Sequence, residues 1–521
     1  MKPETHQSIP AQSQVQQMQV ALNYLQKNHP DAGSWNIQLP NSRQTTTEVT
    51  IRAVGEDPKA RRGGTRITLD SATGEVIEPR DTRGGGFLYR FHFELYGLPR
   101  LWTRWLVGIA TMFMLVAIVS GIITHKKIFK DFFTFRSGKG QRSWLDAHNA
   151  TAVFALPFHL MITFSGLLLL MFMFMPWGIN QAYENRQQFL RDQQASMIEQ
   201  PQKAEDVPRE GERAARGERG QQRGVHAQGR GEERPKPELR PAPLTDLAPI
   251  MAAVQQQWKD NPIASINIIS PNTDQAKIEL RALRAESVAH RNVYATLNYN
   301  GVTGQDETDK NIRIKNPSIP SGIYNVVTVL HEARGLDLAL RWLLFCSGIL
   351  GTLMVATGLI LWCVKRAPQQ QKQGYKSFGF RLVEVLNIAA IIGLPLACAA
   401  YFYANRFIPA DVEMRLNWEI RSFFTVWLLT LIYAIFRTHR QAWLDLLLLA
   451  TLAFALLPVV NLMTGGQALW NSIAQGQWMI ASVDLAMWVM AVIFYFAYDK
   501  VKKHQGLPNK KVKTLVQEAE A

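Results

Sequence analysis

The chain has 521 residues, of which 47% are hydrophobic, and it includes 14 Trp. Very apolar stretches alternate with very polar ones, which indicates a membrane protein that carries soluble domains. The net charge of +15 does not indicate nucleic-acid binding, because the basic residues cluster in short loops beside apolar spans, where membrane orientation requires them. The three cysteines lie in apolar segments without a CxxC or CxxCH motif, which argues against disulfides, iron–sulfur clusters and c-type haem.

Residues 1–99 are predicted to form a small α+β domain. The sequence indicates a helix over 13–28, strands over 35–40, 47–54 and 65–70, and a turn at Thr73-Gly74. Residues 1–10 contain neither a signal peptide nor an apolar span. Because we expect this domain to be exported, we also expect an upstream helix that the sequence lacks.

Residues 100–177 are predicted to be a pair of transmembrane helices. The span over 101–124 carries a single charge, Arg104, and is long enough to cross a hydrocarbon core of roughly 30 Å. A second span follows at 150–177. The loop between them is densely basic, with Lys126, Lys127, Lys130, Arg136, Lys139 and Arg142. Such a loop is expected in the cytoplasm.

A charged, Gly- and Arg-rich segment over 178–243 is predicted to be a disordered linker, because its composition cannot bury a core. A second small α+β domain follows over 244–335. Its ATLNYNGVTG (295–304) resembles TRITLDSATG (65–74), and in the next helix, over 336–366, Arg341-Trp342 repeats Arg104-Trp105. The chain therefore contains a duplicated unit, a small domain followed by a membrane helix.

Four further spans are predicted within 367–500, at about 382–404, 421–437, 442–463 and 479–498, before a cytoplasmic tail over 501–521. Basic residues alternate between the loops so that seven spans place both small domains outside and the C-terminus inside. The predicted fold class is thus a polytopic α-helical membrane protein with two small periplasmic α+β domains.

The histidines carry the candidate chemistry, because the spans hold no acidic pair and no Ser/His/Asp constellation. His148 and His159 are eleven residues apart; at about 100° per residue they share one helix face, roughly 16 Å apart, and could serve two stacked haems. An ionisable residue such as His159 in an apolar span is costly and indicates function, although a structural hydrogen bond near Pro157 is an alternative. His125 ends the first span, and His92 and His331 precede the two repeated helices. His439 is interpreted as interfacial.

These features resemble the PepSY-associated transmembrane family of bacterial inner-membrane proteins. The resemblance covers about residues 10–366 and rests on RSWLDAHNATAVFALPFHLMITFSG (142–166), the LHEARG lead-in (330–335) and the repeated Ser/Thr-Gly pairs. It implies PepSY-like small domains and two b-type haems held by membrane histidines, which pass electrons outward to a ferric siderophore. The family's usual leading helix is absent here, and the last four spans extend beyond its core.

On this basis the protein is predicted to be a ferric-siderophore reductase of the bacterial inner membrane. His125 and His148 would share the inner haem, and His159 would share the outer haem with His331, or with His92 as the rival. Arg104 and Arg341 either anchor the helices at the bilayer surface or pair with haem propionates.

The electron donor is predicted to be quinol or a partner protein, because the chain has no GxGxxG loop for a nicotinamide or flavin. Two alternatives from other classes stay open. One is a non-catalytic PepSY sensor or peptidase-binding protein, and the other is a metal or siderophore transporter.

Overall fold

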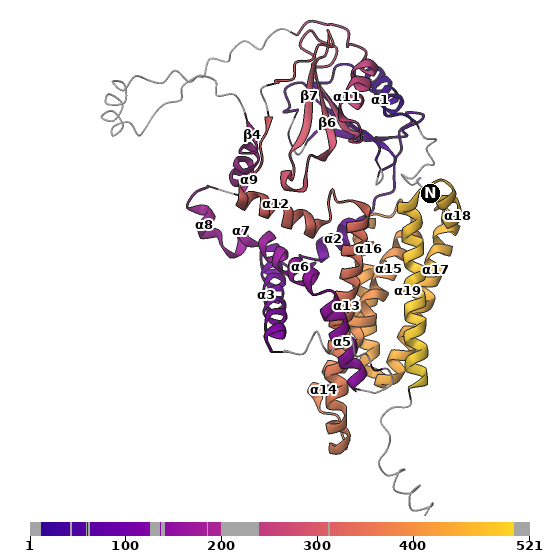
Figure 1. The fold of residues 1–521 in the computed structure, drawn as a ribbon. Coiled ribbons are helices and arrows are strands. Elements are labelled where there is room, and N and C mark those ends of the chain that lie inside the picture. Colours follow the sequence, from indigo (N-terminus) through magenta and orange to yellow (C-terminus); the bar gives the residue numbers. More distant parts are fainter. Residues whose placement is uncertain are drawn as a thin grey trace, which may run out of the picture. The chain divides into compact units, whose positions relative to one another are not determined.

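The computed structural model describes residues 12–41, 44–58, 60, 63–124, 136, 141–184, 186–199, 239–310 and 313–504 (Figure 1). It divides into two compact units. Residues within 9–77 and 176–329 form one of them, here named the sheet unit, and residues within 78–175 and 330–521 form the other, the helical unit. The helix α12 (Ile319–Glu332) runs from the first unit into the second.

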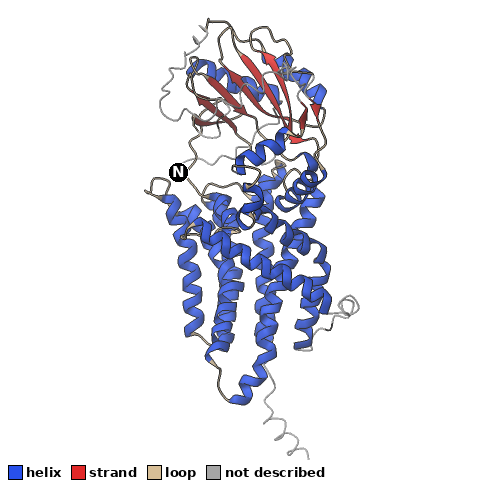
Figure 2. Ribbon diagram, turned by 90° about the vertical axis from the view of Figure 1, so that its left-hand side faces the viewer, coloured by secondary structure: helices blue, strands red, loops and turns tan. Residues whose placement is uncertain are grey.

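The sheet unit contains both copies of the predicted small domain, joined in one antiparallel sheet of six strands in the order β3-β2-β1-β5-β6-β7 (Figure 2). The first copy consists of α1 (Gln14–Asn28), β1 (Ser34–Gln38), β2 (Thr47–Arg52) and β3 (Thr65–Leu69). The second consists of α11 (Leu247–Trp258), β5 (Ile263–Ile269), β6 (Lys277–Ala285) and β7 (Tyr294–Asn300). We had predicted two separate domains, but the first strand of each copy pairs with the other, Ser34 opposite Ile269 and Gln38 opposite Ser265.

A single hydrophobic core lies between this sheet and both helices. Trp35 and Ile37 of β1 and Ile266 and Ile268 of β5 are fully buried, at the period of two that places them on one sheet face. Met18, Leu22 and Leu25 of α1 and Met251 and Val254 of α11 belong to the same cluster. Because neither copy could cover its own edge strand, pairing β1 with β5 removes two exposed sheet edges at once.

The turn that ends each copy confirms the sequence repeat at the level of single hydrogen bonds. Asp70 accepts from the backbone of Ala72 and Thr73 at 2.7 and 2.9 Å. Asn300 accepts at 3.0 Å from Val302 and Thr303 in the second copy. The closing glycines, Gly74 and Gly304, have φ of 76° and 71°, a left-handed conformation that glycine adopts without steric cost.

The segment predicted to be a disordered linker is partly ordered. It contains α8 (Pro176–Asn180), α9 (Arg186–Ala195) and β4 (Ile198–Glu199), and β4 pairs with β8 (Arg313–Ile314). The buried Met197 and Asn325 bring this segment against α12, a packing that composition alone did not reveal. Residues 200–238 of the predicted linker lie outside the described residues.

The first part of the helical unit contains α2 (Gly84–Phe91), α3 (Arg100–Thr124), α5 (Gln141–Phe154), α6 (Leu156–Leu169), α7 (Met171–Phe174) and α13 (Leu338–Gln373). The predicted span over 150–177 corresponds to a bent pair of helices, because α5 and α6 meet at an angle of 67°. Pro157 explains the break: it lacks an N–H and cannot continue the hydrogen bonds of α5. The two histidines of this segment therefore lie on separate helices.

The remainder of the unit is a helical bundle, here named the C-terminal bundle. It contains α14 (Phe378–Ile388), a π-helical turn η2 (Ala389–Gly393), α15 (Leu394–Phe407), α16 (Arg415–Phe436), α17 (His439–Met463), α18 (Leu469–Ala474) and α19 (Trp478–Lys503). Within the described residues, six helices are long and apolar enough to cross a membrane, and the bent pair α5–α6 makes a seventh if it counts as one span. These spans coincide with the predicted ones to within a few residues at most ends.

Candidate functional site

His148 of α5 lies against α13, where it meets a carbonyl and a glycine one helical turn apart. Its Nδ1 atom is 2.9 Å from the Met354 carbonyl oxygen. A Cβ atom placed on Gly358, four residues later, would lie 3.2 Å from His148 Cε1. A side chain here would be a tight fit, so that the imidazole would have to shift by a few tenths of an ångström.

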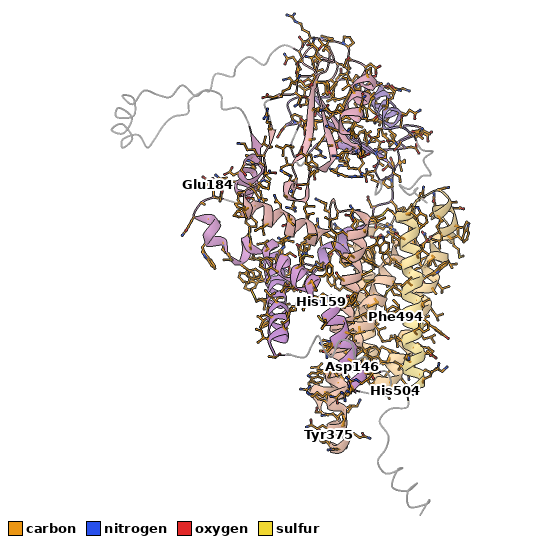
Figure 3. All side chains as sticks on the ribbon, in the orientation of Figure 1. Asp146, His159, Glu184, Tyr375, Phe494 and His504 are labelled. Carbon is orange, nitrogen blue, oxygen red and sulfur yellow. The ribbon has the colours of Figure 1, made fainter. Side chains whose placement is uncertain are left out.

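His159 of α6, labelled in Figure 3, meets α13 in the same manner. The ring has a hydrogen-bonding interaction with the Ser347 backbone, and a Cβ atom on Gly351 would lie 2.8 Å from His159 Nε2. The side chain is 4% exposed, and its Nε2 atom has no hydrogen-bond partner among the described residues. A buried polar atom without a hydrogen-bond partner is costly and calls for an explanation. Among the described residues, His439 Nδ1, Arg104 Nε and Arg341 Nε are in the same state.

His331 of α12 repeats the arrangement on α6. Its Nδ1 atom is 2.7 Å from Ser165 Oγ, the Ile162 backbone also interacts with the ring, and a Cβ atom on Gly166 would lie 3.5 Å from His331 Cε1. Burial, and then the neighbouring His92, lower the pKa of His331. The imidazole is therefore neutral at neutral pH, which is its metal-binding form.

We name this arrangement a histidine seat: a backbone carbonyl at position i of a helix and a glycine at position i+4. His148 occupies the seat Met354/Gly358, His159 the seat Ser347/Gly351, and His331 the seat Ile162/Gly166. In each, the contact to helix backbone or to Ser165 holds one side of the ring. A hydrogen bond at one ring nitrogen fixes the orientation and the tautomer of the imidazole. In His159 the unpaired nitrogen, Nε2, faces Gly351 of α13.

The two seats on α13 are seven residues apart, which corresponds to about two turns and about 10 Å along the axis. They therefore share one face of α13 at two depths. The sequence had predicted two depths from the spacing of His148 and His159 on one straight helix. Because the chain bends at Ala155, His148 and His159 do not lie on one straight helix. Their two depths are set instead by the positions of their contacts along α13.

His92 lies at the C-terminal end of α2 and is exposed. Its ring faces that of His331, with centroids 6.3 Å apart and an angle of 51° between the planes. At this separation both imidazoles would be able to hold one haem. Among the predicted ligands for the outer end, the structure thus brings His331 together with His92.

The remaining predicted residues are placed as follows. Arg104 donates to Glu94 at 3.0 Å, and its guanidinium lies 5.6 Å from the Phe93 ring centroid. Arg341 has a buried Nε atom without a hydrogen-bond partner among the described residues. His125 lies outside the described residues.

His439, which was interpreted as interfacial, is the first residue of α17 and is partly exposed. It accepts a hydrogen bond from Trp443 at 3.1 Å and lies 3.9 Å from the buried Glu384. It therefore belongs to a polar cluster inside the C-terminal bundle, separate from the seats.

The glycines of the seats were missed by sequence reasoning, although a signal for two of them was present. Thr357-Gly358 and Ser165-Gly166 belong to the repeated Ser/Thr-Gly pairs, and both glycines carry a histidine. Gly351 has no such marker. The third repeated pair, Ser120-Gly121, has no described atom within 4 Å of a Cβ placed on its glycine.

The donor set fits a haem better than a bare metal ion. The described residues contain no group of three or more His, Cys, Asp or Glu that could hold an ion. Haem iron needs only axial ligands from the protein, because the porphyrin supplies the other four. The histidines on α5, α6 and α12 are single, separately held imidazoles, a kind of donor that would suit this need.

The family model of the PepSY-associated TM region matches residues 1–365. The chain belongs to the PepSY-associated transmembrane family. The match ends before the C-terminal bundle, and a comparison with curated protein sequences gives no match. The PepSY-associated assignment agrees with the helices that can span a membrane, so this protein is a multi-pass membrane protein of that family.

Proposed function

We propose that this protein is a di-haem transmembrane electron-transfer protein of the bacterial inner membrane, which reduces the ferric iron of a siderophore on the periplasmic side. The observation that carries the proposal is His159, a buried intramembrane histidine whose Nε2 atom has no partner in the described part of the chain. Such a residue is expensive in a membrane unless it serves a function.

His148, His159, His331 and His92 are the described residues that would hold b-type haem, with His125 as a further candidate. Bound haem supplies one-electron chemistry between ferric and ferrous iron. The protein's own contribution is to orient the imidazoles: the Met354 carbonyl and the Ser165 hydroxyl hold the Nδ1 atoms of His148 and His331. Arg104 and Arg341 both have a buried Nε atom without a partner among the described residues. Arg341 is the better candidate for a propionate, since Arg104 already pairs with Glu94 through another nitrogen of its guanidinium.

Electrons are expected from quinol or a partner protein, and the electron acceptor is a ferric siderophore. The iron is substrate here and is separate from the haem iron. Transfer of one electron converts ferric to ferrous iron, which hydroxamate and catecholate oxygens bind far more weakly because the ion carries less charge.

Haem content tests the cofactor. The purified protein is expected to be red, with the Soret and α bands of low-spin haem. His159→Ala is expected to lose about half of the bound haem, because each of two sites needs both axial ligands. His439→Ala is the matched control and is expected to lose none. A colourless wild-type protein from cells grown with ample haem would refute the proposal, and so would full haem content in His159→Ala.

Reoxidation of the reduced protein tests the reaction. Protein reduced with dithionite and freed from excess reductant is mixed anaerobically with a ferric hydroxamate, and the loss of the reduced α band is followed. The gallium complex of the same hydroxamate has the same shape and charge but accepts no electron. Reoxidation by the iron complex alone is expected; equal rates with both complexes, or none with either, would contradict a siderophore reductase.

A further inference from the structure

The helix that precedes His92, α2, has a sequence with low intrinsic helix stability. α2 has only eight residues, and the first three are Gly84, Gly85 and Gly86. Glycine is the poorest helix former after proline, and isolated helices of this length are marginal in water. Its partner in the repeat, α12, has fourteen residues. Something outside α2 must therefore keep it in place.

Polar groups of α15 and α16 bind the start of α2. Glu419 Oε2 accepts from Thr82 Oγ1 and from the backbone N–H of Arg83, both at 3.0 Å. Arg415 donates to the carbonyl of Asp81, and Tyr401 donates to the carbonyl of Gly84 at 3.0 Å. The bond from the Arg83 N–H satisfies a donor that has no intrahelical partner at the N-terminus of a helix. The others tie the backbone carbonyls of this segment to α15 and α16.

The Arg415–Glu419 pair itself is buried and fully engaged. The two side chains are 2% and 0% exposed and lie 2.6 Å apart. Glu419 Oε1 also accepts from Asn405 at 2.9 Å, and Arg415 donates further to the carbonyls of Asn405 and Ile408. A buried ion pair is tolerated when such additional hydrogen bonds complete it, and the loss of one partner is then strongly disruptive.

Aromatic side chains hold the other end of α2. Phe87 lies 5.2 Å from the ring centroids of both Tyr401 and Phe423. Phe91 contacts Phe423 at 5.5 Å and Trp427 at 6.1 Å. Phe87 is 6% exposed, so the apolar face of α2 is buried against α15 and α16.

His92 is thereby fixed from both sides. Phe91, immediately before it, is packed in the aromatic cluster. Glu94, two residues after it, forms ion pairs with Arg100 and Arg104 of α3 at 2.9 and 3.0 Å. The His92 side chain has few contacts of its own, and the restraints on the neighbouring residues set where its ring lies relative to His331.

We infer that the C-terminal bundle positions His92 opposite His331. It does so through the Arg415–Glu419 pair and through the aromatic contacts of Phe87 and Phe91 with Tyr401, Phe423 and Trp427. Glu419 and Phe87 are positioning residues for this pair of imidazoles. The bundle lies outside the matched family region, so this gives the C-terminal half of the chain a role at the histidine pair. The consequence for haem rests on the proposed function, but the restraint on α2 does not.

Hydrogen–deuterium exchange of the full-length protein tests the restraint without reference to haem. Glu419→Gln is expected to raise the amide exchange rate in residues 81–93 about tenfold or more. Without the Arg415–Glu419 ion pair, local opening of this segment costs less free energy. Glu384→Gln is the matched control, because Glu384 is also a buried, ion-paired carboxylate of the C-terminal bundle. It is expected to leave residues 81–93 unchanged. Phe87→Leu removes aromatic contacts without unpairing a charge and gives a second variant should Glu419→Gln fail to fold.

A redox titration of the same variants tests the positioning. In Glu419→Gln and Phe87→Leu, one haem midpoint potential is expected to shift while the other keeps its wild-type value. Unchanged exchange in residues 81–93 would overturn the restraint, and faster exchange with both potentials unchanged would overturn the positioning of His92. A wild-type protein without haem would refute the proposed function, whereas the exchange experiment would still decide whether the bundle holds α2.

Discussion

Addition of a methyl group at Gly351 would place it too close to the His159 ring. A Cβ atom there would lie 2.8 Å from Nε2, closer than van der Waals contact allows, and close-packed interiors yield little. Gly351→Ala is therefore expected to remove the haem that depends on His159, as His159→Ala does. Gly358→Ala, with a milder contact of 3.2 Å to His148, is expected to lower haem affinity rather than abolish binding. Pyridine haemochrome assays measure both.

Gly348→Ala is the control for this series. It lies on the same helix, but a Cβ atom on it would meet no described atom within 4 Å. It is expected to keep full haem content and to stabilise α13 slightly, because alanine is the better helix former. Equal losses in the three glycine variants would contradict the seats and indicate a general effect on α13.

Double variants identify which histidines share an iron. If His92 and His331 form one pair, as their centroid distance of 6.3 Å indicates, the variant lacking both is expected to retain the same half of the haem as either single variant. The variant lacking His159 and His331 is then expected to lose all of it. Retention of half of the haem in the variant lacking His159 and His331 would instead support the pairing of these two residues. Absorbance at the Soret band per protein measures the haem content.

The histidines could be predicted from the sequence because each departs from its surroundings: His159 is ionisable within an apolar span, and His331 precedes a repeated helix. Their seats could not. The spacing of residues along α5 and α6 contains no information about which face of α13 packs against them. His92 was ranked below His331 because Gly97 and Pro99 follow it, but its position is set by α2 and Glu94, which long-range contacts hold in place.

At the scale of elements, an equivalent hairpin position carries an apolar residue in the first copy of the small domain and an acidic residue in the second. Asp306 bridges Tyr299 in the second copy, where Val76 bridges Leu69 in the first. Hydrogen bonds from the Thr308 side chain and backbone lower the pKa of Asp306. The folded pKa therefore lies below the unfolded value of about 3.9, so the stabilisation is complete above that value and is lost as the pH falls through the folded pKa.

Asp306→Asn is accordingly expected to lower the thermal midpoint of the full-length protein in detergent at pH 7. The difference from wild type should shrink toward zero as the pH is lowered from about 5 to about 3. Asp260→Asn changes the same charge at an exposed position of the sheet unit and serves as the control. A difference that persists unchanged at the lowest pH would exclude the ionised carboxylate as its cause.

The secondary structure of each copy was predictable because period-two burial and the Thr-Gly turns are local signals. The pairing of β1 with β5, which joins the two copies, could not be predicted. The paired residues are more than 200 positions apart, and no sequence pattern near either strand indicates its partner. The break between α5 and α6 had a local signal in Pro157, but the 67° angle depends on how both helices pack against other elements. Order in α9 and β4 likewise comes from partners distant in sequence.

At the scale of the whole molecule, the joined sheet constrains how the chain crosses the membrane. Gln38 and Ser265 pair in one sheet, so both copies lie on the same side. The chain between them must then cross an even number of times. α3 supplies one crossing, and the bent pair α5–α6 must supply the other. With α13, the pair α14–α15, α16, α17 and α19, we expect seven crossings and a C-terminal tail on the side of the membrane opposite the two copies.

Reporter fusions test this count and its direction. The basic residues between α3 and α5 predict that this loop is cytoplasmic and the sheet unit periplasmic. Alkaline phosphatase is therefore expected to be active when fused after Gly301 and inactive when fused after Gly138 or after Lys503, while green fluorescent protein gives the opposite pattern. Activity on the same side for the fusions after Gly138 and Gly301 would mean that α5–α6 returns without crossing. In that case β1 and β5 could not pair, and the duplicated sheet itself would be wrong.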